Sequence, residues 1–282
     1  MKVGAFTIDA VRDGQLVIAK EFEYPEMPEE RWQPWQHLLV DGAKVTNELG
    51  GYLVRGNGIV ALMDIGFGPA DVPEEGGIKW EAGAFLDSLR ALGVQPEEVT
   101  DIFFSHLHYD HIGWASVDGR SVFPNATLRC DQADWDHFTH PDHVPNPEEA
   151  AFPPEMRPRN KLAPVEKQLQ TWSADGEVLP GFTVIRRPGH SPGTTAVRLD
   201  SEGESVFFIG DIAHHQAELI EPDWQGVSDF DVELGRKARK DTREQLADSG
   251  APFVAAHFLG FSWGRVVRSA DGGFAWEPYS RA

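Results

Sequence analysis

Short apolar segments separated by polar turns recur along most of the chain, and segments of this kind predict β-strands. Asp13-Gly14 and Gly56-Asn57 separate successive segments and predict hairpins, and Asp271-Gly272-Gly273 predicts a closing hairpin late in the sequence. The segments expected to form strands are 3–9, 15–19, 47–55, 58–64, 102–104, 126–130, 182–186, 196–199, 205–209 and 252–256.

Two longer stretches, 80–92 and 231–249, space their apolar residues as a helix does. Shorter helices are expected at Pro96 and after Asp131, a favourable N-cap residue. Strands that alternate with helices in this order predict an α/β layered domain. The residues of the later long helix that we expect to face the core are Leu234, Ala238 and Leu246.

Two segments lack regular patterning. Residues 21–36 are acidic and proline-rich, and we expect an irregular arm that packs over the domain or against a second subunit, so a homodimer is possible. Residues 139–164 are also rich in proline and predict a lid, a binding loop or a flexible excursion. His140 and His143 lie there, and we expect solvated side chains rather than metal ligands.

Charge and composition restrict the possible partners. The chain of 282 residues has a formal net charge of −20, which argues against nucleic acid or an anionic membrane as a partner. Its single cysteine, Cys130, excludes an intramolecular disulfide and is expected to be a small apolar core residue. The first residues do not have the pattern of a signal peptide, and no apolar stretch is long enough to span a membrane, so we expect a cytoplasmic protein.

The chemistry concentrates directly after the apolar segment 102–104, in the sequence D-I-F-F-S-H-L-H-Y-D-H-I-G of residues 101–113. Burying polar groups at the end of a strand costs about 2–7 kcal/mol each unless a partner compensates them. A metal ion would supply that compensation, because imidazole and carboxylate groups are metal ligands. The residues that carry these groups are His106, His108, Asp110 and His111.

Three later strands also end at a residue that can bind metal. These residues are His190, Asp211 and His257, and loops at one edge of a layered α/β protein commonly form its functional site. Asp64 follows an earlier strand, and we expect it to bond backbone N–H groups or to orient a metal-binding histidine rather than to bind metal itself. Together these positions predict a metal centre.

The ordered motifs resemble those of the metallo-β-lactamase fold superfamily, from about Val45 to the end of the chain. The resemblance implies one domain over residues 1–282, with the α/β fold of a four-layer αβ/βα sandwich and two metals between the sheets. The motifs that carry it are L-M-D-I-G-F-G at 62–68, H-L-H-Y-D-H at 106–111, G-H-S-P-G at 189–193, G-D at 210–211 and A-H at 256–257.

The resemblance also implies a ligand set. One metal would be bound by His106, His108 and His190, the other by Asp110, His111 and His257, and Asp211 would bridge the two. A hydroxide held between two such metals could hydrolyse a substrate near neutral pH. Zinc suits these ligands, although iron, manganese or cobalt would also be compatible with them.

Within the superfamily the chain looks closest to the branch of quorum-quenching lactonases and organophosphate or aryl-ester hydrolases. Lactonases of that branch usually carry a tyrosine three residues after the bridging aspartate, where this chain has His214. We expect Asp110 and His214 to take part in catalysis, although His214 could instead be a surface-loop residue. The expected walls of an apolar substrate pocket, which could equally be core residues, are Trp114, Phe258, Phe261 and Trp263.

The leading hypothesis is therefore a dinuclear metallohydrolase that cleaves a carboxylic ester or lactone of a small apolar substrate. Alternatives are a phosphotriester hydrolase, a thioesterase of the glyoxalase II type and, outside enzymes, a structural metal-binding module. A structural zinc site would be closed and four-coordinate, whereas seven ligands at separate strand ends favour an open catalytic site.

Overall fold

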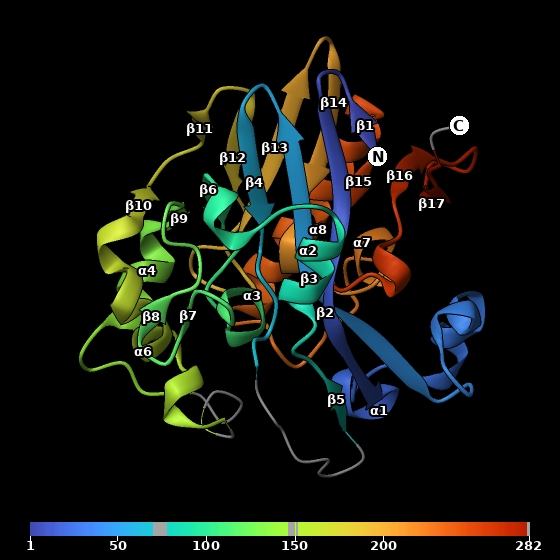
Figure 1. The fold of residues 1–282 in the computed structure, drawn as a ribbon. Helices are drawn as coiled ribbons and strands as arrows, with labels where there is room; N and C mark the ends of the chain where they lie inside the picture. The colour runs from blue at the N-terminus through green and yellow to red at the C-terminus, as the bar shows by residue number, and fades with distance from the viewer. Residues whose placement is uncertain (70–77, 146–149, 151, 281–282) are drawn as a thin grey trace.

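The computed structural model describes residues 1–69, 78–145, 150 and 152–280, and two β-sheets form its centre (Figure 1). In the described part, the first sheet has the order β1-β2-β3-β4-β6-β9-β10, and β5 also pairs with β2. The pairs β4–β6, β6–β9 and β9–β10 are parallel. The strands are β1 (Lys2–Val3), β2 (Phe6–Ala19), β3 (Lys44–Gly56), β4 (Ile59–Met63), β5 (Lys79–Glu81), β6 (Asp101–Phe103), β9 (Thr127–Asp131) and β10 (Leu169–Trp172).

The second sheet follows the chain in order from β11 to β17, and its β14–β15 pair is parallel. The predicted closing hairpin is confirmed, because β16 and β17 pair on either side of Asp271. The strands are β11 (Gly176–Leu179), β12 (Phe182–Arg186), β13 (Thr195–Ser201), β14 (Glu204–Phe208), β15 (Phe253–Val254), β16 (Gly264–Arg268) and β17 (Phe274–Pro278). A separate small ribbon consists of β7 (Ser116–Val117) and β8 (Arg120–Ser121).

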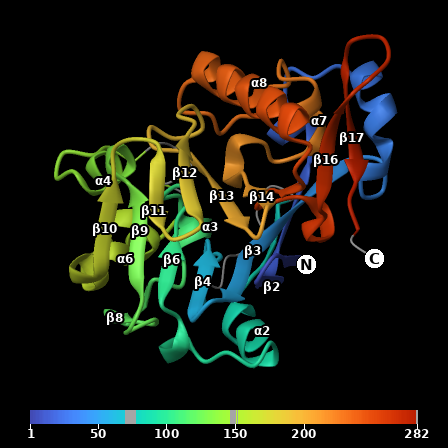
Figure 2. The same ribbon diagram turned by 90° about the horizontal axis from the view of Figure 1, so that it is seen from above.

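Helices flank both sheets, with α2 and α4 on the side of the first sheet and α8 on the side of the second (Figure 2). None of the helices in the described part is long and apolar enough to cross a membrane. The α-helices are α1 (Lys20–Glu23), α2 (Phe85–Ala91), α3 (Tyr109–Ile112), α4 (Gln132–Thr139), α6 (Pro158–Leu162), α7 (Gln216–Ile220) and α8 (Val232–Ser249). The 3-10 helices are η1 (Glu29–Leu38), η2 (Pro96–Glu98), η3 (Pro154–Met156), η4 (Ala163–Gln168), η5 (Gly210–Ile212) and η6 (Leu259–Phe261).

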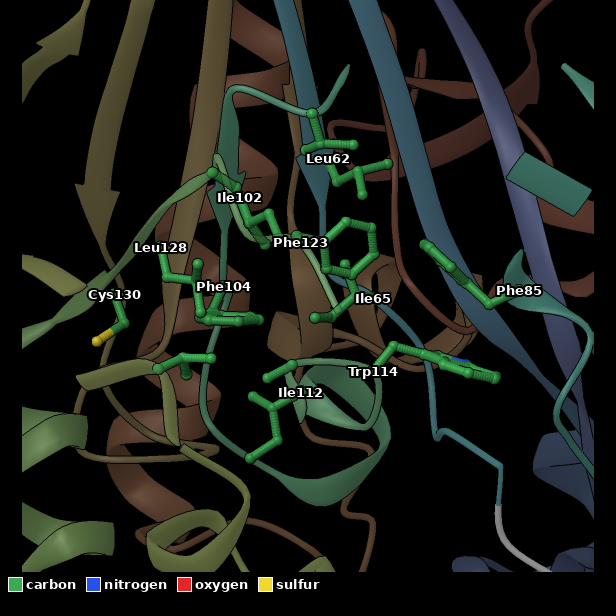
Figure 3. Close-up of a cluster of buried hydrophobic side chains, with 14 of the residues drawn as sticks. Leu62, Ile65, Phe85, Ile102, Phe104, Ile112, Trp114, Phe123, Leu128 and Cys130 are labelled. Carbon is green, nitrogen blue, oxygen red and sulfur yellow. The ribbon is translucent and has the colours of Figure 1, made fainter. Parts of the chain in front are cut away.

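Three buried hydrophobic clusters fill the space between these layers. Between the sheets, Phe103 of β6 stacks on Phe182 of β12 with ring centroids 5.3 Å apart. Outside the first sheet, Ile102 and Phe85 belong to a cluster that joins β6 to α2 (Figure 3). Outside the second sheet, Leu246 of α8 belongs to a third cluster. The predicted four-layer αβ/βα sandwich is therefore confirmed.

Cys130 lies in the cluster outside the first sheet (Figure 3). Its side chain is fully buried, and burial raises the pKa of the thiol well above its ordinary value. The expected role as a small core residue agrees with this position.

The hairpin predicted at Asp13-Gly14 is wrong, because residues 6–19 form the single strand β2. The pairing register between β2 and β3 shifts at Gly14, which marks a bulge in place of a turn. Asp13 is buried at this bulge, and its carboxylate accepts hydrogen bonds from the backbone N–H groups of Phe67 and Phe85 and from Trp114 Nε1. The carboxylate thus satisfies loop donors instead of reversing the chain.

Both long helices differ from the prediction at their N-terminal ends. Trp80 belongs to β5 and pairs with Leu16 of β2, so the first helix begins only at Phe85. Leu234 is 42% exposed although the spacing predicted a core position. It lies in the first turn of α8 beside the loop that contains Gly189, and it is not part of the cluster that holds Ala238 and Leu246.

The acidic segment 21–36 is more regular than expected, because it contains the end of α1 and most of η1. Trp32 of η1 is buried against Trp224, with ring centroids 4.7 Å apart, and Trp35 Nε1 donates a hydrogen bond to Glu221. The arm thus packs over its own chain, because Trp32 is buried there and Trp35 is partly buried. Residues 146–149 and 151 of the predicted Pro-rich loop lie outside the described residues, and the lid or binding role of that loop stays a prediction.

Candidate metal centre

The residues predicted to bind metal lie at one edge of the two-sheet core. β6 leads to His106 and then to α3, whose first turn contains Asp110 and His111. In the second sheet, β14 and β15 are parallel, so their carboxyl ends meet at the same edge. The residues that follow β12, β14 and β15 near this edge are His190, Asp211 and His257.

Three ring nitrogens meet at the first candidate metal position. His106 Nε2 lies 2.8 Å from His108 Nδ1 and 3.1 Å from His190 Nε2, and the remaining pair is 2.9 Å apart. In a tetrahedral zinc site with bonds of about 2.0–2.1 Å, ligand nitrogens are about 3.3 Å apart. Three imidazole nitrogens held this close fit a common cation, because their lone pairs would otherwise repel one another.

Burial and the neighbouring imidazoles lower the pKa values of His106 and His108 well below the ordinary histidine value. Both rings are therefore neutral at pH 7. A neutral ring offers the nitrogen lone pair that a metal requires.

The second candidate position brings together Asp110, His111 and His257. Asp110 Oδ1 lies 3.7 Å from His111 Nε2, and its Oδ2 lies 3.5 Å from His257 Nε2. Burial disfavours protonation of both histidines, but Asp211 and Asp110 outweigh it and raise the pKa values of the two rings. A cation at this position would take the place of those protons.

Asp211 lies between the two positions. Its Oδ2 is 3.2 Å from His111 Nε2, 3.0 Å from His257 Nε2 and 3.5 Å from His190 Nε2. Its Oδ1 is buried and has no hydrogen-bond partner among the described residues. A buried carboxylate with one unused oxygen and contacts to both ligand groups fits a bridge between two cations.

Acceptor groups at Nδ1 orient two of the histidines, His111 and His257. Asp64 Oδ2 is 3.0 Å from His111 Nδ1, and its two oxygens also accept hydrogen bonds from the backbone N–H and hydroxyl of Ser105. His257 Nδ1 donates to the carbonyl oxygen of Glu48 at 2.8 Å. Such outer contacts set the direction of the ligating nitrogen, and the Asp64 contacts match the supporting role expected for that residue.

Asp134 of α4 joins the two loops that contain the first three histidines. Its carboxylate accepts hydrogen bonds from the backbone N–H of Leu107 at 3.0 Å and from the hydroxyl of Ser191 at 2.9 Å. It is fully buried, and it also accepts the backbone N–H of Gly193. Sequence reasoning did not identify Asp134, because nothing in its local sequence distinguishes it from a helix-surface aspartate.

His214 is buried and lies beside Asp211, with Nε2 3.5 Å from Asp211 Oδ2. Its ring stacks on His257 with an interplanar angle of 9°. Its Nδ1 is 3.3 Å from Glu218 Oε2, and although burial opposes protonation, Glu218 and Asp211 raise the pKa of the ring. The surface-loop alternative is therefore wrong, because η5 and α7 carry His214 into the interior.

The neighbouring His215 has a different environment. Its Nε2 lies 3.8 Å from Glu23 Oε1, and its ring is 5.9 Å from that of Tyr24. Burial lowers the pKa of His215 to about 4. His140 lies outside the metal centre with its side chain 60% exposed, as expected. His143 is less exposed than expected, because its ring lies 4.8 Å from that of His137.

The four aromatic residues expected to line a pocket occupy core positions. Trp114 and Phe258 lie in the clusters outside the two sheets, Phe261 lies between the sheets, and Trp263 packs against that central cluster (Figure 3 shows Trp114). These positions do not support a role in lining a substrate pocket. Their spacing after strand ends did not reveal the direction of their side chains.

A different group of rings lies beside the metal centre, and we call it the His108 rim: His137, Phe138 and Phe230, of which Phe138 is itself buried in the core. The Phe138 ring is 5.4 Å from the His108 ring, and the Phe230 ring is 5.2 Å from the His137 ring. Phe230 is 61% exposed, and its backbone N–H donates to the carbonyl oxygen of His190. Neither phenylalanine belongs to a sequence motif, so the sequence did not indicate the rim.

Comparison with known proteins agrees with this arrangement. Residues 51–257, which include every predicted ligand, match the sequence model of the metallo-beta-lactamase superfamily. The chain belongs to this superfamily. The predicted family is therefore confirmed.

Members of the superfamily with similar sequences include an N-acyl homoserine lactonase of Bacillus cereus, which is 28% identical over 164 residues. That match spans 58% of this chain and 58% of the lactonase. A probable metallo-hydrolase of Mycobacterium tuberculosis is 25% identical over an alignment of 228 residues, and the match covers 73% of this chain and 68% of the relative. The chain thus aligns with little more than half the length of the lactonase.

Solved structures of the superfamily match over all of this chain. The dizinc quorum-quenching lactonase AidC, in complex with a product, has a TM-score of 0.84 at 25% identity, and the match covers 97% of its chain. The hydrolase AbOPH has a TM-score of 0.86 at 24% identity, also over 97% of its chain. The same sandwich is thus found in proteins that share about a quarter of its residues.

Proposed function

We propose that the chain is a metal-dependent hydrolase that cleaves a carboxylic ester or lactone of a small apolar substrate. The observation that carries this proposal is Asp211, whose Oδ2 contacts ligand groups of both candidate metal positions while its Oδ1 has no partner among the described residues. A purely structural zinc site would be closed and four-coordinate. The similarity to the dizinc lactonase AidC supports the same reaction class.

The residues divide into two ligand groups and a bridge. His106, His108 and His190 would hold one ion, Asp110, His111 and His257 the other, and Asp211 would join them. We propose zinc for both positions, because imidazole-rich sites suit it. When bound, two such ions act as Lewis acids and lower the pKa of water so that it can attack near neutral pH.

His214 would act on the substrate directly. Glu218 fixes its Nδ1, so Nε2 faces the space beside Asp211. From there Nε2 could donate a hydrogen bond to the carbonyl oxygen and pass a proton to the leaving alkoxide. This is the role that we propose in place of the tyrosine of related lactonases. Asp110 is 15% exposed, more than Asp211, so we propose that it faces the substrate as well as one ion.

The His108 rim would contact the apolar part of the substrate. Phe230 is 61% exposed and its backbone N–H is bonded to His190, so an apolar group held over the first metal position would meet its ring. Phe138 is buried beside His108 and would support this surface from below. This placement supports an apolar acyl or aryl group in the substrate.

The test is a panel of aryl esters, lactones, phosphotriesters and thioesters, assayed with protein whose metal content has been measured. We expect two zinc ions per chain and turnover of esters or lactones. His108→Ala should abolish turnover, whereas His140→Ala, at an exposed histidine outside the centre, should keep it. Preferred cleavage of phosphotriesters or thioesters, or no turnover by protein with two metals bound, would overturn the proposed substrate class.

A further inference from the structure

The segment that precedes α8 holds the His190 loop by its backbone. The N–H of Phe230 donates to the carbonyl oxygen of His190 at 3.1 Å, and the N–H of Asp231 donates to that of Gly189 at 2.9 Å. Gly189 also approaches Gly235 so closely that a Cβ on it would lie 2.4 Å from the Gly235 nitrogen. The position of His190 is therefore coupled to the start of α8.

The same segment places a carboxylate behind the imidazole ring. Asp229 Oδ1 lies 3.7 Å from His190 Nδ1, the ring nitrogen that faces away from His106 and His108. Both side chains are 3% exposed. His190 Nδ1 has no hydrogen-bond partner in the part of the chain that the structure describes, so Asp229 is the acceptor placed to receive its proton. A shift of less than 1 Å would bring the two atoms to about 3 Å, an ordinary hydrogen-bond length.

Asp229 is itself held in place. Its Oδ2 accepts a hydrogen bond from an Arg239 guanidinium nitrogen at 2.9 Å and another from Gln225 Nε2 at 3.2 Å. Arg239 projects from α8 and is 1% exposed. A Cβ on Gly235 would lie 2.4 Å from Asp229 Oδ2, so that glycine leaves the space which the carboxylate occupies. A buried guanidinium and a buried carboxylate stabilise each other here, because each would otherwise be an uncompensated charge.

Two other imidazoles of the centre have a comparable carboxylate. Asp64 lies behind His111 and Glu218 behind His214. We infer that Asp229 is the positioning residue for His190, and that Arg239 of α8 fixes Asp229 for this purpose. The inference rests on the metal-binding part of the proposed function. An imidazole that binds metal through Nε2 carries its proton on Nδ1, and an acceptor there fixes the direction of the ring and strengthens the ligand.

The consequence is a selective effect on one ion. Asp229 reaches the first metal position through His190, whereas Asp64 and the Glu48 carbonyl oxygen serve His111 and His257 at the second. Loss of the Asp229 acceptor should therefore lower the affinity for the ion at the first position about 10–100-fold, while the ion at the second position stays bound.

The experiment measures zinc binding to the full chain by titration against a chelator, with zinc per chain determined by elemental analysis. We expect Asp229→Asn to retain one ion at chelator concentrations where the unaltered chain retains two. Arg239→Lys keeps the positive charge but loses the guanidinium geometry. It should lower the affinity for the same ion to a smaller extent. The matched control is Asp223→Asn, which removes a carboxylate that is 66% exposed and paired with Arg31 in the arm, and it should bind both ions as before.

Equal binding by Asp229→Asn and the unaltered chain would overturn the positioning role. Equal loss of both ions, with the circular dichroism spectrum of the folded chain unchanged, would also overturn it. Should Asp229→Asn fail to fold, Arg239→Lys decides the matter by the same measurement. An unaltered chain that binds two ions but hydrolyses no substrate would overturn the proposed function while leaving the positioning role standing.

Discussion

Glu218 holds His214 at two points, because its Oε2 accepts the backbone N–H of His214 and also lies 3.3 Å from Nδ1 of the ring. The two residues are four positions apart around the start of α7, so the contact is local and rigid. Burial disfavours the Glu218 carboxylate, but His214 outweighs burial and lowers the pKa of Glu218 to about 2. The imidazole therefore faces an ionised partner throughout the neutral range, with Nε2 directed toward Asp211.

Replacement of His214 tests its role as a proton donor. We expect His214→Phe to lower kcat by about 10²–10⁴-fold, the usual contribution of a positioned acid or base, while both metals stay bound. Glu218→Gln should lower kcat less, because the ring remains but is less firmly oriented. Kinetics and elemental analysis of the same preparations check this. Loss of one metal in His214→Phe would instead identify His214 as a ligand, which its proximity to His190 and Asp211 also permits.

Phe230 should determine how strongly long acyl groups bind. Its ring is 61% exposed at the His108 rim, so Phe230→Ala removes apolar contact area without opening a core cavity. We expect KM to rise about tenfold for esters or lactones with long acyl chains, equivalent to about 1.4 kcal/mol, with kcat unchanged. Short-chain substrates should show no change in KM. Leu259→Ala, at a residue 38% exposed in η6, provides a control outside the rim. A uniform change in KM at every chain length would contradict this specificity role.

Asp13 should be essential for stability although it lies outside the metal centre. Its carboxylate accepts the N–H groups of Phe67, Gly68, Gly83 and Phe85, at 2.7 to 3.0 Å, together with Trp114 Nε1. We expect Asp13→Ala to lower the free energy of unfolding by about 3–5 kcal/mol, because several buried donors lose their acceptor. Denaturant unfolding of the metal-free chain measures this. Asp9→Ala is the control, since that carboxylate pairs with Arg55 near the surface and should cost about 1 kcal/mol or less.

His215 should make stability depend on pH. Burial lowers its pKa to about 4, below the ordinary value of 6.5, so the folded chain holds the ring neutral where the unfolded chain protonates it. This contribution to stability is present above pH 6.5 and decreases as the pH falls toward 4. Between pH 7 and pH 4.5 the unaltered metal-free chain should lose about 2.5 kcal/mol more unfolding free energy than His215→Phe. Parallel pH dependence of the two chains would contradict the assignment.

The loop of residues 106–111 could be predicted to bind metal from the sequence because its candidate ligands are close together along the chain. His106, His108, Asp110 and His111 follow one buried strand within six positions, and a short apolar strand with a polar tip has a recognisable pattern. The glycines and proline beside His190 similarly indicated a tightly shaped turn. Ordered motifs of this kind identified both the superfamily and the four-layer fold.

The positions that sequence reasoning missed depend on contacts between distant segments. Asp13 resembled a turn residue, and its partner Trp114 lies 101 positions away. Asp134 contacts Gly193 across 59 positions. Asp229 contacts His190 although two strands, β13 and β14, lie between them in the sequence. Trp80 was assigned to a helix because its spacing fitted one, whereas its pairing with β2 is a tertiary effect. Propensity and spacing do not contain such long-range partners.

The proposed ligands come from both sheets: four follow β6 of the first sheet, and His190, Asp211 and His257 follow strands of the second. Ions held in this way would join two halves of the chain that otherwise adhere mainly through the apolar layer between them. Metal binding would then act as a reversible crosslink, and its free energy would add directly to resistance against separation of the sheets. The chain's lifetime against proteolysis should accordingly depend on the supply of metal as well as on the sequence.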